Sequence, residues 1–336
     1  MPGAMGTGST PDGESGGRGG AAAPTVGQPG LGARLQDSAV RAAIAAALAL
    51  PYRTRVRLFG ATTERVLAPA TKLGRRIEQN LDFIYPDLPR KRRQDIARGS
   101  ANATGRLMIE LYSWRDLARD MEEIQPNGPG WAAFEAAHRR GQPVLLMTGH
   151  FGNYLAARAC LIARGYPIGG FYRPMANPYF NRHYVASMAA SGGPVFPDSA
   201  GGTKGLIRFL RGGNAAMLLN DLYIGTGIEL PFLGQPAMTS TAPAEIAKRT
   251  GAAMIPIWGI RQPDGLSFEV ELDAPLATDD PVAATREYNA AVEARVRAAP
   301  EQWFWMHRRW KRKWRGGKGM EGDPHPAQLP SRRARV

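Results

Sequence analysis

The stretch PVLLMTGHFGNY (Pro143–Tyr154) constrains the fold of this chain more than any other part. Its first five residues, Pro143–Met147, are an apolar run long enough for one buried strand, and a Thr-Gly pair separates this run from His150. The next segment, Tyr154–Gly165, carries apolar residues at helical spacing. The stretch therefore predicts a strand, a tight turn and a helix, with His150 at the turn, where open α/β sheets place ligands. A histidine that only satisfies the backbone at a strand end is the alternative.

The same alternation of short apolar runs and helical segments continues beyond Gln142. Strands are predicted at Val144–Met147, Ile168–Tyr172, Ala215–Leu219, Ala253–Ile260 and Phe268–Leu272. Helices are predicted at Tyr154–Gly165, Asn177–Ala190, Gly205–Arg211, Ala242–Thr250 and Val282–Ala298. Such alternation predicts an α/β fold with a mostly parallel sheet that is flanked by helices.

The segment Arg34–Pro126 has a helical pattern throughout. Its helices are expected at Leu35–Leu50, Arg53–Ala68 and Lys72–Phe83, with one or two longer helices over Arg90–Leu117. Within the first of them, Ala39–Leu50 is too short and too rich in alanine to span a membrane, and it suits an amphipathic helix that lies on one, or a docked helix. Because arginines crowd the same region, we expect a helical, membrane-facing front, with a solvated charged surface as the alternative.

Shifts in composition divide the chain into four parts. Residues 1–33 are rich in Gly, Pro and Ser and are expected to form a disordered tail. Residues 34–126 form the membrane-associated helical front, and residues 127–315 form the α/β core, which ends in a basic, Trp-rich run. Residues 316–336 are polar and contain prolines, so a second disordered tail is predicted there.

Charge and cysteine content limit the classes of function. The net charge of +14 and the pI of about 10.3 favour a polyanionic partner, which is a nucleic acid, an anionic membrane surface or an acidic substrate. The single cysteine, Cys160, excludes an intrachain disulfide and a cysteine-based zinc site, and its apolar surroundings favour core packing. Nucleotide-binding, G-x-S-x-G and H-E-x-x-H motifs are missing from the sequence, so we expect no metal and no bound redox cofactor.

Three chemically matched residues follow three of the predicted strands: His150, Arg173 and Asp221. Because the carboxyl ends of parallel strands meet at one edge of a sheet, these side chains are expected to face one cleft. A histidine can take a proton from a hydroxyl, a carboxylate can hold the other N–H of the imidazole, and an arginine can bind an anionic group. The set predicts acyl transfer to a hydroxyl.

Five motifs in order resemble the bacterial lipid A late acyltransferases, the lauroyl/myristoyl acyltransferase family of the lysophospholipid-acyltransferase superfamily. They are HFGNY, FYRPMANPYF, PFLGQPAMT, TGAAMIPIWGIR and PEQWFWMHRRWK, within about Arg34–Trp314. The phosphatidylinositol mannoside acyltransferases are related to this family. The resemblance implies an enzyme on the cytoplasmic face of the cell inner membrane. Such an enzyme moves a fatty acyl chain from an acyl carrier protein or coenzyme A thioester to a hydroxyl of a lipid A precursor or related glycolipid.

The resemblance also implies roles for particular residues. His150 matches the family's histidine and is expected to be the general base, and Asp221 matches an aspartate that can pair with it. Arg173 matches the arginine of the Y-R-P motif and is expected to bind substrate phosphate or the developing oxyanion. Gly152 and Asn153 are expected to shape the turn and contact substrate, with a backbone N–H there completing an oxyanion site.

Leu155 departs from the family pattern, which carries an acidic residue five positions after the histidine. A leucine can neither orient the imidazole nor stabilise its protonated form, and removing the orienting acid from a comparable triad costs on the order of 10⁴ in rate. Three explanations are open: Asp221 takes over the pairing with His150, the protein binds lipid or acyl carrier without turnover, or the chain is a variant of an active parent.

The basic, Trp-rich run also fits an anionic lipid. Arg308 and Arg309 are expected to hold substrate phosphate and Lys311–Arg315 to face headgroups, with the tryptophans at the membrane interface. Interleaved aromatic and basic residues also suit single-stranded nucleic acid, which is the alternative from another class. Because no recognised nucleic-acid fold accompanies the run, we expect an acyl carrier protein, an anionic glycolipid or phospholipid and a membrane surface as partners, and no nucleic acid.

Overall fold

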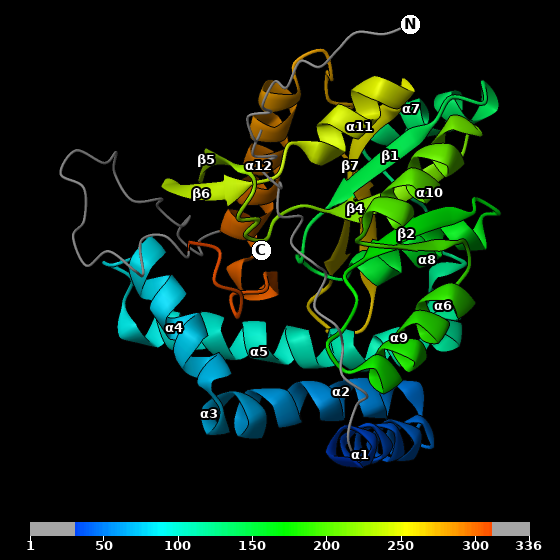
Figure 1. Cartoon of the computed structure of the whole chain (residues 1–336). Coiled ribbons are helices and arrows are strands. Elements are labelled where there is room, and N and C mark those ends of the chain that lie inside the picture. The colour runs from blue at the N-terminus through cyan, green and yellow to red at the C-terminus, as the bar shows by residue number, and fades with distance from the viewer. Residues whose placement is uncertain (1–30, 311–336) are drawn as a thin grey trace, which may run out of the picture.

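The computed structural model of the protein describes residues 31–310 (Figure 1). Residues 1–30, the predicted tail over 316–336 and the Lys311–Arg315 run lie outside the described residues. The last three residues of the expected N-terminal tail, Leu31–Ala33, are instead the first turn of helix α1.

The core of the molecule is a six-stranded sheet in the order β3-β2-β4-β1-β7-β8. Its strands are β1 (Val144–Thr148), β2 (Ile168–Tyr172), β3 (Val195–Pro197), β4 (Ala215–Leu219), β7 (Ala253–Arg261) and β8 (Phe268–Leu272). All neighbouring strands run parallel except β7 and β8, which are antiparallel. The predicted α/β fold with a mostly parallel sheet is therefore confirmed.

Strand β1 lies at the centre of this sheet, and each of its residues is buried. Successive side chains point to opposite faces, so Val144 and Leu146 belong to the cluster built with α6, α7 and α8, whereas Leu145 and Met147 belong to the cluster built with α10, α11 and α12. This covering of both faces explains why the strand is an unbroken apolar run. Cys160 is buried in the first cluster, as expected.

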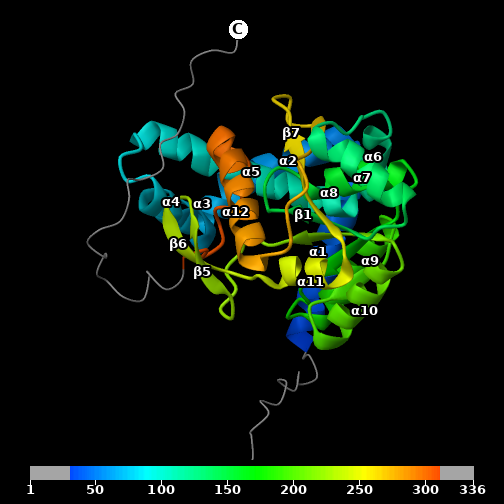
Figure 2. The same cartoon turned by 90° about the horizontal axis from the view of Figure 1, so that it is seen from above.

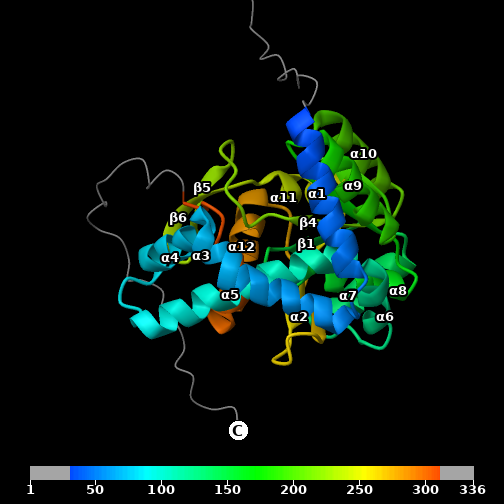
Figure 3. The same ribbon diagram turned by 90° about the horizontal axis from the view of Figure 1, so that it is seen from below.

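The helices form two groups. Those that cover the sheet are α7 (Pro129–Arg139), α8 (Tyr154–Ala163), α9 (Pro178–Ala190), α10 (Ala200–Arg211), α11 (Ala242–Thr250) and α12 (Pro281–Ala298). Those of the N-terminal part are α1 (Leu31–Leu48), α2 (Tyr52–Thr62), the π-helix η1 (Thr63–Leu67), α3 (Ala68–Ala70), α4 (Lys72–Ile84), α5 (Arg90–Tyr112) and α6 (Trp114–Met121). Figures 1 and 3 show α2 and α5 side by side below the sheet, with α1 beside α9.

A two-stranded antiparallel hairpin, β5 (Ile228–Phe232) and β6 (Gln235–Thr239), stands apart from the main sheet (Figures 1 and 2). Its two-residue turn, Leu233 and Gly234, has φ values of 52° and 75°, the geometry that twists a tight hairpin correctly. Leu233 is buried and its N–H donates to Glu293 Oε1 on α12 at 2.7 Å. Sequence analysis missed this hairpin because prolines occupy both strands and no Asn-Gly or Asp-Gly turn marks it.

Three of the four tryptophans of the C-terminal run are core residues, which contradicts their expected place at a membrane interface, and the fourth, Trp314, lies outside the described residues. Trp303, Trp305 and Trp310 are buried and pack against one another and against Phe232. They follow the 3₁₀ turn η2 (Pro300–Gln302). A tryptophan has enough apolar area to suit a membrane interface or a protein core. Here the hairpin and the N-terminal helices bury these side chains.

The N-terminal helices and the sheet share one core. Ile77 and Leu81 of α4 belong to the same buried cluster as Met147 and Trp258 of the sheet. Over residues 31–310, no helix is long and apolar enough to cross a membrane.

The buried side chain of Asn80 ties the C-terminal segment to α4, because its Nδ2 donates to Trp305 O at 2.7 Å and to His307 O at 2.8 Å. We expect Asn80→Leu to lower the free energy of unfolding by about 2 kcal/mol, because two carbonyls lose their donor. Urea denaturation followed by circular dichroism measures this. The same change at exposed Gln79 is the control, and an equal loss in both variants would contradict the assignment.

Candidate active site

His150 and Asp221 meet because of the register between two neighbouring parallel strands. Thr148 of β1 lies opposite Leu219 of β4, and each functional residue stands two positions beyond this pair. Asp221 Oδ1 lies 2.8 Å from His150 Nδ1, and Asp221 Oδ2 accepts the backbone N–H of His150 at 2.7 Å. The carboxylate therefore fixes both the ring and the backbone of the histidine.

The Asp221 carboxylate is fully buried and ionised. Burial by itself raises the pKa of a carboxyl, but the neighbouring His150 and hydrogen bonds from His150 and Trp303 outweigh it and hold the pKa of Asp221 below its ordinary value. An ionised carboxylate can only accept, so His150 Nδ1 is the donor and its Nε2 is the basic nitrogen. The His150 side chain is 24% exposed and lines a cleft, so Nε2 is available to a substrate.

Tyr288 of α12 holds the ends of β1 and β4 together. Its hydroxyl donates to Thr148 O at 2.5 Å and accepts the N–H of Asn220 at 3.3 Å. Burial raises the pKa of this hydroxyl well above its ordinary value, so the group remains a donor. Sequence analysis did not single out Tyr288, because its position on a long amphipathic helix carries no sign of this contact.

Gly152 makes the tight turn after His150 possible. Its φ is 59°, and a Cβ there would lie 2.1 Å from Gly259 O of β7. The Gly152 N–H donates to Gln302 O at 2.9 Å, and the Asn153 N–H donates to Gly259 O at 2.7 Å. Because both N–H groups already have carbonyl partners, the expectation that one of them completes an oxyanion site is wrong for this conformation.

Asn153 is a structural residue below the turn rather than a lining residue of the cleft. Its Oδ1 caps α8 by accepting from Leu155 N at 2.9 Å and from Ala156 N at 3.2 Å. Its Nδ2 donates to Glu110 Oε2 at 2.8 Å. Neither Asn153 nor Gly152 lines the cleft that His150 faces, so both residues position the histidine instead of contacting substrate there.

Glu110 of α5 is a buried anchor that sequence analysis missed. It accepts from both terminal nitrogens of Arg261, with Oε1 at 2.8 Å and Oε2 at 2.5 Å, in addition to its bond with Asn153. All three side chains are buried. In the sequence Glu110 is one of many charged residues on a helix. Its partners Arg261 and Asn153 lie 151 and 43 residues away, so no local sequence pattern predicts this network.

The cleft in front of His150 has a volume of about 550 Å³ and largely apolar walls. The wall residues include Phe171, Met188, Leu206, Met217, Ile224 and Ile246. Arg173 also lines the cleft; its side chain is 70% exposed, with Nε 3.4 Å from Asp198 Oδ2. The His150 imidazole, apolar walls and an exposed cation suit a substrate with a hydrocarbon chain and an anionic group.

The structure does not support the expected phosphate-binding role of Arg309. Its side chain is fully buried, its donors bond to Leu222 O, Met238 O and Thr239 Oγ1, and it lies over the ring of Phe232. Burial lowers the pKa of Arg309 to about 10. The residue secures the hairpin. Arg308 is exposed and lies outside the lining of the cleft.

Comparison with known proteins identifies the family. Residues 33–312 match the model of the bacterial lipid A biosynthesis acyltransferases. The chain belongs to this acyltransferase family. It is 26% identical over 275 residues to the lipid A biosynthesis lauroyltransferase of Escherichia coli, covering 78% of this chain and 87% of that protein. It is 24% identical over 265 residues to a lipid A biosynthesis acyltransferase of Haemophilus influenzae, covering 76% and 81%. It is 24% identical over 220 residues to a phosphatidylinositol mannoside acyltransferase of Mycobacterium tuberculosis, covering 63% and 69%.

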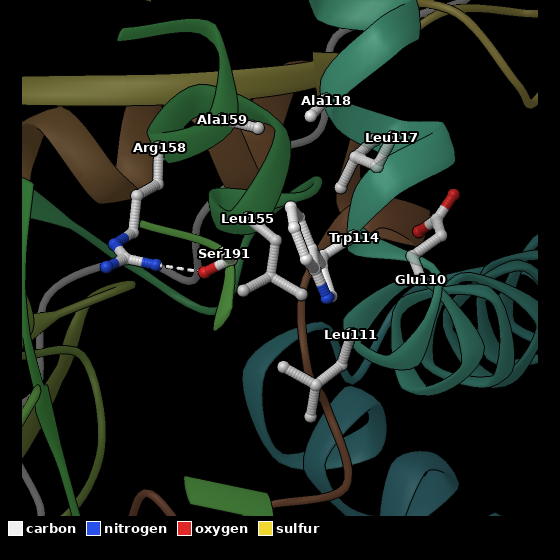
Figure 4. A pocket seen from close by; sticks show the side chains of 9 residues that line it. All are labelled: Glu110, Leu111, Trp114, Leu117, Ala118, Leu155, Arg158, Ala159 and Ser191. Atoms are coloured by element: carbon white, nitrogen blue, oxygen red, sulfur yellow. Dashed lines mark hydrogen bonds between the residues drawn. The ribbon is translucent and has the colours of Figure 1, made fainter. Parts of the chain in front are cut away.

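Leu155, the departure of this acyltransferase from the resemblance, lies in the first turn of α8. Figure 4 shows its side chain beside Trp114, with Leu111 and Arg158 nearby. The Nδ1 atom of His150, which an orienting acid would hold, already bonds to Asp221.

In the part of the chain that the structure describes, no group of three or more His, Cys, Asp or Glu residues could hold a metal ion.

Removing the charge of Glu110 should destabilise the enzyme strongly. We expect Glu110→Gln to lower the free energy of unfolding by about 3–5 kcal/mol, because the buried Arg261 guanidinium loses its counter-charge. Asp82→Asn is the matched control, since Asp82 pairs with Arg93 in an exposed position and should cost at most about 1 kcal/mol. Chemical denaturation compares them. Equal costs would show that the Glu110 network does not hold the turn.

Proposed function

We propose that this enzyme transfers a fatty acyl chain from an acyl carrier protein or coenzyme A thioester to a hydroxyl of a lipid A precursor or a related phosphorylated glycolipid. The observation that carries the proposal is the bond between His150 Nδ1 and the buried, ionised Asp221 at the edge of an apolar cleft. The relatives named for lipid A and phosphatidylinositol mannoside acylation support a glycolipid acceptor. No metal or redox cofactor takes part in this proposal.

The reaction follows from the tautomer of His150. Its Nε2 takes the proton of the acceptor hydroxyl while the hydroxyl oxygen attacks the thioester carbonyl carbon. The tetrahedral intermediate then expels the thiolate, which receives the proton from Nε2, so an ester and a free thiol leave the site. Asp221 stays ionised throughout and stabilises the imidazolium that forms between these steps.

Arg173 suits the anionic part of the acceptor. It stands at the end of β2, beside β4, so it lines the same cleft as His150 while its guanidinium remains mostly exposed. Its partner Asp198 is also partly exposed and 3.4 Å away, so an incoming phosphate can replace this weak ion pair. We assign Arg173 to the phosphate of the glycolipid.

Three variants test the catalytic assignment. We expect His150→Ala and Asp221→Asn each to lower the rate by about 10³–10⁴, because the base or its orienting carboxylate is lost. Leu155→Asp should not raise the rate, because Asp221 already holds Nδ1 of His150. Products from both thioester types and phosphorylated glycolipid acceptors are followed by mass spectrometry.

Two outcomes would contradict this assignment. If only Leu155→Asp forms product, the chain is a disabled acyltransferase whose own role is lipid binding. If His150→Ala keeps the parental rate, His150 is not the general base. If product forms only with acceptors other than lipid A precursors, the proposed acyl transfer stands and the proposed acceptor is wrong.

We also propose that α1, α2 and η1 lie on the cytoplasmic face of the cell inner membrane. In the described range 31–310, these elements hold six of the ten exposed large hydrophobic residues. The six are Leu35, Val40, Leu48, Leu58, Val66 and Leu67. Exposed arginines on the same elements, such as Arg53, Arg57 and Arg65, suit an anionic leaflet. Figure 3 shows α1 and α2 towards the viewer.

Vesicle binding tests the membrane proposal. The parent should sediment with vesicles that contain anionic phospholipid, and less as salt rises, because exposed charges are screened. Leu58→Glu with Val66→Glu should weaken sedimentation several-fold, since two exposed apolar side chains that would enter the membrane become charged. Val282→Glu on α12 is the control with similar exposure at a distant element, and an equal loss there would contradict the assigned surface.

A further inference from the structure

A second, much smaller cavity lies between α5, α6 and α8 (Figure 4). Its volume is about 20 Å³, roughly the space of one water molecule. The lining is mostly apolar and includes Leu111, Trp114, Leu117 and Ala159. A cavity with such walls suits hydrocarbon better than water.

Two residues line both this cavity and the cleft that holds His150: Leu155 and Arg158. They stand one turn apart on α8 and form the wall between the two spaces. Arg158 is a fixed part of the wall, because its guanidinium is buried and bonds to Ile168 O, Gly192 O and Ser191 Oγ. Leu155 makes only apolar side-chain contacts and is partly exposed, so its side chain decides whether the two spaces connect.

We infer that Leu155 sets the length of the acyl chain that the enzyme accepts, by closing the cleft off from the cavity between α5, α6 and α8. The inference rests on the proposed acyl transfer. The thioester carbonyl must reach His150, so the chain attached to it runs along the apolar walls that include Leu155. Leu155 thereby limits the hydrocarbon that fits, and a smaller side chain at this position opens the cavity to the end of a longer chain.

The first experiment measures chain-length preference. Parent, Leu155→Ala and the milder Leu155→Val compete for an equimolar series of saturated acyl thioesters, and the products are resolved by mass spectrometry. We expect Leu155→Ala to raise the ratio of longer to shorter products by about tenfold or more, because a methylene that newly fits an apolar pocket is worth at least that factor. Leu155→Val should shift the ratio in the same direction by less.

Two matched variants separate this effect from general loosening. Leu155→Ala with Ala118→Leu refills the cavity from α6 and should return the ratio towards the parental value. Leu73→Ala is the same change at a partly buried residue of α4 that lines neither space, and it should leave the ratio unchanged. Active Leu155 variants with the parental product distribution would overturn the inference.

A binding measurement keeps the inference testable if the proposed acyl transfer fails. A fatty acid brominated at its terminal carbon quenches tryptophan fluorescence on contact, and Trp114 lines the cavity. The part of the quenching that comes from Trp114 is the part that is lost when Trp114→Phe is added to each protein. We expect this part to be strong in Leu155→Ala and weak in the parent. Trp114-dependent quenching that is equal in both proteins, or missing from Leu155→Ala, would overturn the inference whatever the enzyme's activity.

Discussion

The candidate active site depends on one buried charge, the carboxylate of Asp221. A buried carboxylate is costly unless hydrogen bonds replace its water, and Asp221 receives three: two from His150 and one from Trp303 Nε1 at 2.8 Å. These donors come from the turn after β1 and from the C-terminal segment, while the carboxylate itself follows β4. The histidine is therefore oriented only when the sheet register and the C-terminal segment are both in place, so that segment helps to position His150 through Asp221.

The N-terminal helices support this arrangement from below. Glu110 of α5 holds Asn153 and with it the cap of α8, and Ser100 of the same helix donates to Trp303 O at 2.7 Å. The helix thus fixes both segments that converge on Asp221. A protein that touches a membrane through α1 and α2 would transmit that contact to the site through α5, which lies beside α2. The helical front therefore packs beneath the candidate active site and shares its core, rather than forming a separate appended anchor.

The sequence predicted what depends on local pattern and on strand ends. The unbroken apolar run of β1 and the Thr-Gly break located the turn, and the position of Asp221 after β4 put it at the same edge as His150. The Glu110 contacts could not be predicted from the sequence, because a glutamate on an arginine-rich helix has the pattern of a solvated face. The expectation that Arg309 binds phosphate was wrong for the same reason, because a run of cations predicts exposed side chains. The hairpin that buries Arg309 has no clear sequence pattern from which it could be predicted.

The leucine at position 155 follows from the physics of its surroundings. A carboxylate there would meet Leu111 and Trp114 on one side, and on the other an arginine whose donors already bond to carbonyls and a hydroxyl. Such a charge loses hydration without gaining a free partner, so it is costly in this geometry. An apolar side chain at position 155 avoids this cost. Because Asp221 already holds Nδ1 of His150, no acid is needed at position 155 for that role, and the apolar lining on both sides of Leu155 suits a leucine.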